Sequence, residues 1–357
     1  MKLNNRWMIA ALLCAMNLVL PAQGKRKIII DQDGAGPGGT DQQAILLLLQ
    51  SPETEVLGVT LVTGDAWLKE EMAHTLRTLE IVGRTDIPVF RGAELPLIRR
   101  KQDTELWEQR YGTFTWLGAW TPGRYHAADK LGDMPEGMPS TKAADEDASH
   151  FLVRMVHQYP NEVTIYEGGP MTNLALAISI DPEFAGLAKE LVFMGGSVHP
   201  QTSDPEFAHN PHHEFNLWFD PEAAHIVLRA PWKKIACTTV DISLKTQLTA
   251  ELLDRLRKSD APAAKYAGTY TKLRGFDYLW DELAALAWLD PSLITKKETR
   301  YVDVDLDRGA GYGNTLTWSE KDRPRTRAGT VEIQGDYDRE KFYKMFVDLL
   351  STPRPHN

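Results

Sequence analysis

Short apolar runs alternate with longer amphipathic segments along most of this chain. Continuous apolar runs predict buried strands at residues 28–30, 55–63, 87–90, 163–167, 191–194 and 234–239. Apolar residues at helical spacing predict helices at residues 41–51, 67–83, 146–158, 283–289 and 339–350. Two edge strands are predicted near the end of the chain, at residues 299–305 and 330–334. This alternation predicts an α/β fold with a mostly parallel central sheet flanked by helices.

The first predicted strand ends in an acidic, glycine-rich loop. Residues 31–41 read DQDGAGPGGTD, so Asp31 and Asp33 follow the strand and Asp41 opens the next helix. Open α/β sheets bind ligands at the carboxyl ends of their strands. Carboxylates gathered there repel one another unless a cation lies between them, and Ca²⁺ accepts oxygen ligands in irregular geometry. The alternative is that Asp41 caps the helix while the other two are solvated loop acids.

Other predicted strands end in similar residues. Gly64 and Asp65 follow the second, Gly168 and Gly169 follow the fourth, and Gly195 follows the fifth. Glycine lets a ligand approach the backbone closely. Because the ends of parallel strands share one edge of a sheet, we expect these loops to form one crevice.

Two stretches break the regular alternation. Residues 98–142 are irregular and rich in aromatic residues, which is typical of a lid or covering loop. Their aromatic side chains either fasten the segment to the body or contact a ligand. Residues 197–213 contain His209, His212 and His213, but this spacing matches no common zinc pattern. We expect a solvated or substrate-facing loop there.

Composition narrows the classes of function. The 357 residues are 43% hydrophobic, with 10 Trp, 11 Tyr and 11 Phe, which is enough for a sizeable core. The formal net charge of -9 argues against a nucleic acid polymer as partner, because phosphate binding requires a concentrated basic face.

The N-terminus has the pattern of a secretory signal peptide. Lys2 and Arg6 precede the apolar residues 7–20, and Ala22 offers a small residue for cleavage. Residues 1–24 are therefore predicted to be a signal peptide, and residues 25–357 a single secreted or periplasmic domain without a membrane segment. An uncleaved membrane anchor is the alternative. Cleavage removes Cys14 and leaves Cys237 alone, so no internal disulfide is expected.

Six segments together resemble the nucleoside hydrolase family, and in the family's order. They are DQD with TDQQAILLLL, GVTLVTGD, GGPMTNLALAI, ELVFMGG, EFNLWFDPEAAHIV and LWDELAALAWLDPS. The resemblance covers nearly the whole chain after residue 27. It implies a Rossmann-like fold, Ca²⁺-dependent hydrolysis of the N-glycosidic bond of ribonucleosides, and assembly into a dimer or tetramer.

The resemblance also assigns roles to individual residues. The calcium ligands would be Asp33, Asp41, the main-chain carbonyl of Gly168, and Asp281. Asp33 would also be the general base, and Asp31 would support the metal loop from behind.

Matching positions imply the sugar contacts. Glu214 and Asn216 would bind the ribose hydroxyls, and Met194 would line the sugar site. The family's loop is tighter than residues 34–39, and it places an acid that binds the ribose 2′-hydroxyl where this chain has Thr40. Thr40 is therefore predicted to contact substrate with altered sugar recognition.

The residue before the last predicted calcium ligand, Asp281, indicates which base the enzyme accepts. The inosine-uridine branch has a histidine there that protonates the base, whereas this chain has Trp280. Tryptophan can stack on a purine but cannot plausibly donate a proton to a ring nitrogen. Trp280 therefore resembles the purine-specific branch. Asp65, where many members carry Asn, either contacts the substrate or caps a helix.

Two other hypotheses remain open. The segment IIIDQDGAG also resembles haloacid-dehalogenase-type phosphatases, in which Asp31 would attack phosphorus, Asp33 would act as the acid and Mg²⁺ would replace Ca²⁺. The altered loop could instead leave a nucleoside- or sugar-binding protein of the same fold without turnover.

Overall fold

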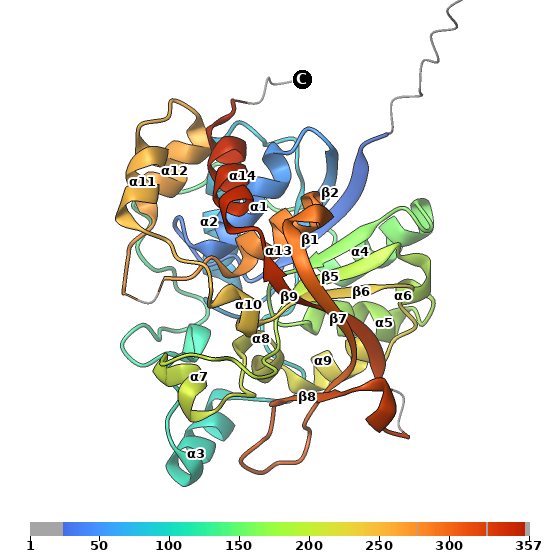
Figure 1. The fold of residues 1–357 in the computed structure, drawn as a ribbon. Helices are drawn as coiled ribbons and strands as arrows, with labels where there is room; N and C mark the ends of the chain where they lie inside the picture. The colour runs from blue at the N-terminus through green and yellow to red at the C-terminus, as the bar shows by residue number, and fades with distance from the viewer. Residues whose placement is uncertain (1–23, 276, 326–327, 354–357) are drawn as a thin grey trace, which may run out of the picture.

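Nine strands form one central sheet in the computed structural model, which describes residues 24–275, 277–325 and 328–353 (Figure 1). Their order across the sheet is β3 (Val89–Arg91), β2 (Thr54–Leu61), β1 (Arg26–Gln32), β4 (Thr164–Glu167), β5 (Glu190–Met194), β6 (Ile235–Thr238), β9 (Gly329–Tyr337), β7 (Ile294–Val304) and β8 (Thr315–Trp318). Every pairing from β3 to β9 is parallel, and β7 is antiparallel to both its neighbours. The predicted mostly parallel α/β sheet is confirmed.

Helices cover both faces of this sheet because its central strands are apolar on both sides. In β1, Ile28 and Ile30 join one hydrophobic cluster and Ile29 joins another, as the alternation of side chains along a strand requires. The first face carries α1 (Thr40–Gln50), α2 (Leu68–Ile81), α10 (Val240–Ser243), α11 (Ala250–Arg257), α12 (Pro262–Tyr270), α13 (Trp280–Leu289) and α14 (Arg339–Ser351). The second face carries α4 (Ala148–Gln158), α5 (Thr172–Ile180), α6 (Phe184–Leu187) and α9 (Pro221–Leu228).

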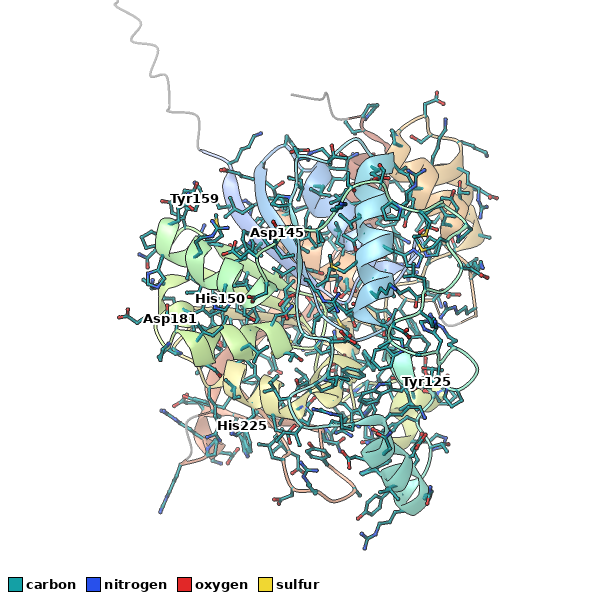
Figure 2. All side chains as sticks on the ribbon, turned by 180° about the vertical axis from the view of Figure 1, so that it is seen from behind. Tyr125, Asp145, His150, Tyr159, Asp181 and His225 are labelled. Atoms are coloured by element: carbon teal, nitrogen blue, oxygen red, sulfur yellow. The ribbon has the colours of Figure 1, made fainter. Side chains whose placement is uncertain are left out.

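The second face is seen in Figure 2. His150 marks α4 there, Asp181 the end of α5, and His225 marks α9. Each of these residues belongs to a pair formed by a histidine and an aspartate close to the surface. Figure 1 shows α3 (Lys101–Tyr111) and α7 (Pro205–His209) together at the opposite end of the molecule from the C-terminus.

Two predictions about the end of the sheet were wrong. The strands predicted at residues 299–305 and 330–334 are β7 and β9, and both are internal rather than at the edge. The edge is β8, whose four residues were too few to give a pattern. β9 is internal because it enters the sheet beside β6, in parallel, although it comes last in the chain.

The aromatic-rich segment 98–142 is more ordered than predicted. It contains α3 and a short 3-10 helix, Gly118–Trp120. α3 shows no helical pattern of apolar residues because Thr104 is its one buried residue. Most of the aromatic side chains fasten the segment to the body: Trp120 lies 4.5 Å from Phe219 of α8 (Phe215–Phe219), measured between ring centroids.

Arg99 fixes the start of this segment. Its side chain is 1% exposed, and its guanidinium lies 4.4 Å from the ring centroid of Trp218 and 4.3 Å from that of Tyr312. Such cation–π contacts strengthen when they are removed from water. The segment is therefore tied both to α8 and to the loop before β8.

Most of the N-terminal predictions concern residues that the structure does not describe. The predicted signal peptide, residues 1–24, lies outside the described residues except for Gly24. Across residues 24–275, 277–325 and 328–353, no helix is long and apolar enough to cross a membrane. Cys237 is buried and forms no disulfide within that part of the chain.

The strand order defines where a ligand is expected. Across the sheet, the chain order of the strands runs backwards from β3 to β1 and then forwards from β4 to β6, so it reverses between the adjacent, parallel strands β1 and β4. The crevice beyond the carboxyl ends of the strands at such a reversal is the usual binding site of an open α/β sheet. Asp33 follows β1 directly and Gly168 follows β4 directly, so both stand at this point.

Candidate active site

Carboxyl groups from three elements lie near enough at the switch point for their charges to act on one another. Asp33 follows β1, Asp41 lies in the first turn of α1, and Asp281 lies in the first turn of α13. All three are at most 3% exposed. The charge of Asp281 acts on Asp41, and the charge of Asp33 acts on Asp281. The structure thus brings together residues more than 200 positions apart in the sequence.

Burial and mutual repulsion dominate the electrostatics of this group. Loss of hydration, and then the charges of Asp41 and Asp65, raise the pKa of Asp33 well above its ordinary range. Burial, followed by the charges of neighbouring acids, raises the pKa values of Asp41 and Asp281 in the same direction. One oxygen of Asp281 is buried without a hydrogen-bond partner. The cluster therefore carries negative charge that its protein surroundings do not compensate.

The glycine-rich loop between Asp33 and Asp41 is held tightly by neighbouring helices. A Cβ atom at Gly36 would lie 2.4 Å from the ring of His74 on α2, and one at Gly38 would lie 2.7 Å from a backbone nitrogen at the end of α12. Gly38 also has φ +76°, which favours glycine. The longer loop is therefore a fitted segment between α2 and α12, with no space for side chains at these positions.

Two buried glutamines fix the same loop from α1. The side-chain amide of Gln42 donates to the carbonyl of Gly34 at 2.7 Å, and that of Gln43 donates to the carbonyl of Gly38 at 2.7 Å. The backbone N–H of Ala35 donates to Asp41 Oδ2 at 2.8 Å. These bonds satisfy buried carbonyls and set the position of the Asp41 carboxyl group.

The predicted sugar-binding residues lie beside the carbonyl of Gly168. Asn216 Nδ2 donates to that carbonyl at 3.0 Å and to the carbonyl of Met194 at 3.1 Å. Glu214 accepts from the backbone N–H groups of Gly196, Asn216 and Leu217, at 2.9, 2.8 and 3.0 Å. Glu214 thereby caps α8, and this fixed carboxylate stands at the strand tip of β5.

Thr40 bonds within the protein. Its hydroxyl donates to Glu282 Oε2 at 2.6 Å and accepts from the backbone N–H of Asp281 at 3.3 Å. Tyr166 of β4 donates to the carbonyl of Asp281 at 2.9 Å. Thr40 thus ties the start of α1 to the start of α13, and so holds Asp41 and Asp281 together.

Asp31 supports the site from beneath. It is fully buried, and its Oδ1 accepts from Asn173 Nδ2 at 2.8 Å. Burial raises the pKa of Asp31 to about 6, against the effect of that hydrogen bond. A carboxyl group enclosed in this way is not placed to attack phosphorus, which counts against the phosphatase hypothesis. Its place agrees with the predicted supporting role.

Trp280 and Asp65 border the same site. Trp280 is half-buried and lies 4.9 Å from Tyr278 and 5.9 Å from Phe207 of α7, measured between ring centroids. The backbone N–H of Asp65 donates to Asp33 Oδ2 at 2.9 Å, which places Asp65 against the acid cluster. Asp65 lies two residues before the N-cap Trp67 of α2, and its side chain does not cap that helix.

Trp116 is a site residue that sequence reasoning missed. Its indole N–H donates to Asp65 Oδ1 at 2.6 Å, although it belongs to the aromatic segment 98–142. The guanidinium groups of Arg124 and Arg274 lie 4.9 and 6.0 Å from the ring of Trp116. Their positive charges lower the pKa of Asp65, but burial raises it by more. The contact joins residues far apart in the chain, so no local signal could have revealed it.

A cavity of about 300 Å³ lies beside Asp65, between the aromatic segment and the start of α2. Its lining includes Trp67, Glu70, Arg124 and His126. His126 Nε2 lies 2.9 Å from Glu70 Oε2, which joins the two walls. The segment 98–142 therefore forms one wall of the space next to the site.

The histidine-rich segment meets expectation only in part. His209 and His212 are exposed, as predicted for a solvated loop, whereas His213 is fully buried, with its ring stacked 4.5 Å from that of Phe114. The neighbouring apolar rings of Phe114 and Trp218 explain this burial. In the part of the chain that the structure describes, there is no group of three or more His, Cys, Asp or Glu side chains that could hold a metal ion.

Comparison with known proteins identifies the family. Residues 28–344 match the family model described as inosine-uridine preferring nucleoside hydrolase.

The chain belongs to this nucleoside hydrolase family. It is 31% identical to the probable uridine nucleosidase 2 of Arabidopsis thaliana, over 91% of this chain and 98% of that protein. It is 28% identical to the inosine-uridine preferring nucleoside hydrolase of Crithidia fasciculata, over 91% and 97% of the two chains. A solved plant nucleoside hydrolase has 27% identity and a TM-score of 0.72, over 92% and 99% of the chains.

Membership of this nucleoside hydrolase family establishes the reaction class. The protein is an N-ribosyl hydrolase, which cleaves the N-glycosidic bond of ribonucleosides with water. The match extends across the sheet and the helices that carry the acid cluster. This result supports the nucleoside hydrolase hypothesis over the phosphatase alternative.

The close approach of Gly64 to Asp33 gives a test of the site. A Cβ atom at Gly64 would lie 2.1 Å from Asp33 Oδ2. We expect Gly64→Ala to displace that carboxyl group and to lower nucleoside hydrolysis about a hundredfold, because small misplacements of reacting groups are costly. Gly309→Ala is the control, since nothing lies within 4 Å of its added atom. Full activity of the Gly64 variant would mean that Asp33 has no part in the reaction.

Proposed function

We propose that this nucleoside hydrolase is Ca²⁺-dependent and prefers purine ribonucleosides. The observation that carries the metal proposal is the set of buried aspartates at the switch point, whose negative charges lack a positive partner. Isolated buried carboxylates are strongly unfavourable, so such a set requires either protons or a cation.

The donor atoms around this charge fit a hard divalent cation. Asp33, Asp41 and Asp281 supply carboxylate oxygens, and Gly168 supplies a main-chain carbonyl beside Asn216. Oxygen donors without nitrogen or sulfur suit Ca²⁺ or Mg²⁺, and the flexible coordination of Ca²⁺ suits an irregular set. When bound, the ion would neutralise these carboxylates and make a neighbouring water molecule more acidic.

The residues of the chain itself would carry out the remaining tasks. Asp33 would take the proton of the attacking water, since it follows β1 directly at the switch point. Glu214 and Asn216 would hold the ribose hydroxyls, and Met194 would line the sugar. Breaking an N-ribosyl bond builds positive charge on the sugar, which nearby carboxylates stabilise.

Support for a purine comes from the aromatic groups near Trp280. Its ring, with Phe207 and Tyr278 close by, offers a stacking surface for a large base. A second candidate is uridine, because the similar Arabidopsis protein is named a probable uridine nucleosidase. Membership of the hydrolase family counts against the alternative of binding without turnover.

The proposed role of Asp33 predicts the behaviour of Asp33→Asn. Asparagine keeps the shape but cannot accept the proton of water, so we expect kcat to fall by about 10²–10⁴. Ribose release from inosine measures this change. Asp181→Asn, at the surface beyond α5, is the control and should keep wild-type kcat. An Asp33→Asn enzyme with normal kcat would assign the base to another residue.

The proposed metal predicts a pH-dependent stabilisation. The raised pKa values mean that the metal-free fold binds more protons than the unfolded chain, so its stability falls as pH rises above the ordinary aspartate range. Ca²⁺ at about 100 times its Kd should add about 2.7 kcal/mol.

We expect the shift in Tm on adding Ca²⁺ to be larger at about pH 8 than at about pH 5, where protons compete for the same oxygens. Thermal unfolding with Ca²⁺ and with chelator measures it. An equal rise in Tm with Ca²⁺ at both pH values would contradict the proposed ligands. So would an Asp281→Asn variant whose Tm rises with Ca²⁺ as much as that of wild type.

The proposed base preference predicts the effect of Trp280→Leu. Removing the indole should lower kcat/KM for inosine and guanosine about tenfold and leave uridine less affected, because a stacked aromatic pair contributes roughly 0.5–1.5 kcal/mol beyond its buried area. The ratio of kcat/KM for inosine to that for uridine checks this. A wild-type ratio below one would favour uridine and reject the purine proposal. Trp232→Leu, on the far face beside Phe184, is the control.

A further inference from the structure

The departing base requires a proton, and the position before Asp281 cannot supply one. Purine and pyrimidine anions leave poorly, so an acid that protonates the base contributes strongly to rate. Trp280 carries an indole N–H, which is not acidic at neutral pH. If a side chain performs this step, it must come from another element.

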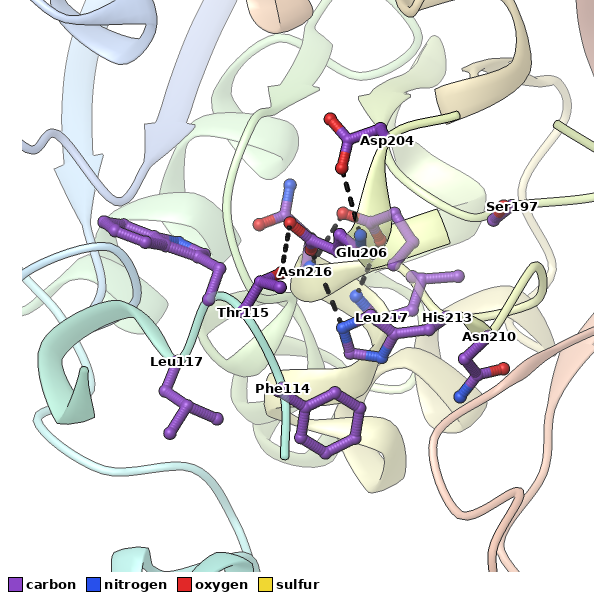
Figure 3. A network of polar contacts seen from close by, with 12 residues as sticks. Phe114, Thr115, Leu117, Ser197, Asp204, Glu206, Asn210, His213, Asn216 and Leu217 are labelled. Atoms are coloured by element: carbon purple, nitrogen blue, oxygen red, sulfur yellow. Dashed lines mark hydrogen bonds and ion pairs between the residues drawn. The ribbon is translucent and has the colours of Figure 1, made fainter. Parts of the chain in front are cut away.

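Glu206 on α7 has the chemistry of such an acid. Its Oε2 accepts from the hydroxyl of Thr115 at 3.2 Å, and its Oε1 lies 3.8 Å from His213 Nε2 (Figure 3). Asp204 caps α7 by accepting from the backbone N–H of Glu206 at 3.0 Å. The carboxyl group is therefore fixed between the aromatic segment and the loop before α8, with 18% of its side chain exposed.

The neighbours of Glu206 place it at the base side of the site. Phe207, the next residue of α7, lies 5.9 Å from the ring of Trp280. Thr115, which holds the carboxyl group, precedes Trp116, whose indole bonds to Asp65. The charges of Glu214 and Asp65 both act on Glu206. Glu206 is thus close enough to the site to feel the charges of Glu214 and Asp65.

Glu206 retains its proton at neutral pH. Burial, with the charges of Asp204, Glu214 and Asp65, raises its pKa to about 8, although the bond from Thr115 acts in the opposite direction. His213 does not take the proton, because burial and the nearby charge of Arg99 lower the pKa of its ring to about 3. Neither ring nitrogen of His213 has a hydrogen-bond partner. A neutral carboxylic acid facing a neutral imidazole is the resulting state.

We propose that Glu206, held between Thr115 and His213 and next in the chain to Phe207, whose ring lies near Trp280, is the acid that protonates the departing base. The inference rests on the proposed function. As the C1′–N bond breaks, its electron pair passes to the base nitrogen, which takes the carboxyl proton of Glu206. The oxygen of water forms the new bond to C1′, and a proton of that water passes to Asp33. Exchange with solvent then returns Glu206 to the acid and Asp33 to the base.

Glu206→Gln tests this step. Glutamine keeps the shape and the contact with Thr115 but has no acidic proton. With inosine, we expect kcat to fall about 10²–10⁴-fold, and the fall in rate above about pH 8 to disappear. With p-nitrophenyl β-D-ribofuranoside, whose nitrophenolate leaves without a proton, we expect kcat within about twofold of wild type.

Comparing the two substrates shows whether Glu206 acts as an acid or only supports the structure of the site. An equal loss on both substrates would overturn the proposal, since it would indicate a damaged site. Unchanged hydrolysis of inosine would also overturn it. A wild-type enzyme that releases ribose from neither substrate would refute the proposed function and this inference with it, whereas a loss confined to inosine supports both.

Two further variants complete the experiment. Glu222→Gln on α9 is the matched control, because Glu222 is a partly buried glutamate that accepts from Tyr312 at 2.6 Å outside the site. It should match wild type on both substrates. Thr115→Val removes the bond that lowers the pKa of Glu206, so the decline in rate should move to higher pH. A decline that stays in place would contradict the assignment even if Glu206→Gln failed to fold.

Discussion

Uncompensated negative charge at the switch point is the constraint on which the rest of the site depends. Asp33, Asp41 and Asp281 are nearly inaccessible, and burial raises the pKa of each. Their charges also act on one another. An arrangement that is unfavourable by itself persists because α1, α13 and β1 are fixed by their cores, and it gives the site its affinity for positive charge.

Buried polar side chains convert that core packing into the positions of the acids. Gln42 and Gln43 hold the loop carbonyls, and Thr40 joins the first turns of α1 and α13. Buried at the start of an otherwise apolar helix, unpaired glutamines would cost stability, but every amide N–H group of these two has a partner. Hydrogen bonds from these side chains therefore hold the glycine-rich loop, residues 34–39, in place.

The two halves of the site come from different kinds of structure. The acid cluster and the residues beside Gly168 stand on strand ends and helix starts of the sheet scaffold. The part of the site that we propose to contact the base comes from the segment 98–142, which contains Trp116, and from α7, which contains Glu206. Both lie in connections between the main elements. Connecting segments change more readily than the scaffold. The scaffold therefore carries the acid cluster, and in our proposal these connections shape the recognition and departure of the base.

The sequence by itself determined the sheet, its mostly parallel order and the presence of acids and glycines at the strand tips. Those features arise from local patterns: apolar runs, helical spacing and the residues that follow each strand. From Asp33 and Asp41 the acid cluster could be inferred, and Asp281 followed from its place in a recognisable segment. The helix α3 gave no signal because it buries a single residue, and β8 was too short.

The tertiary structure decided which distant residues meet. It placed β9 inside the sheet, buried His213 among aromatic rings, turned the hydroxyl of Thr40 towards α13 and brought Trp116 to Asp65. It also gave Glu206 an environment in which a carboxylic acid stays protonated. Contacts of this kind depend on packing between elements far apart in the chain, and so does the loss of hydration that shifts a pKa. Neither leaves a periodic trace in the sequence.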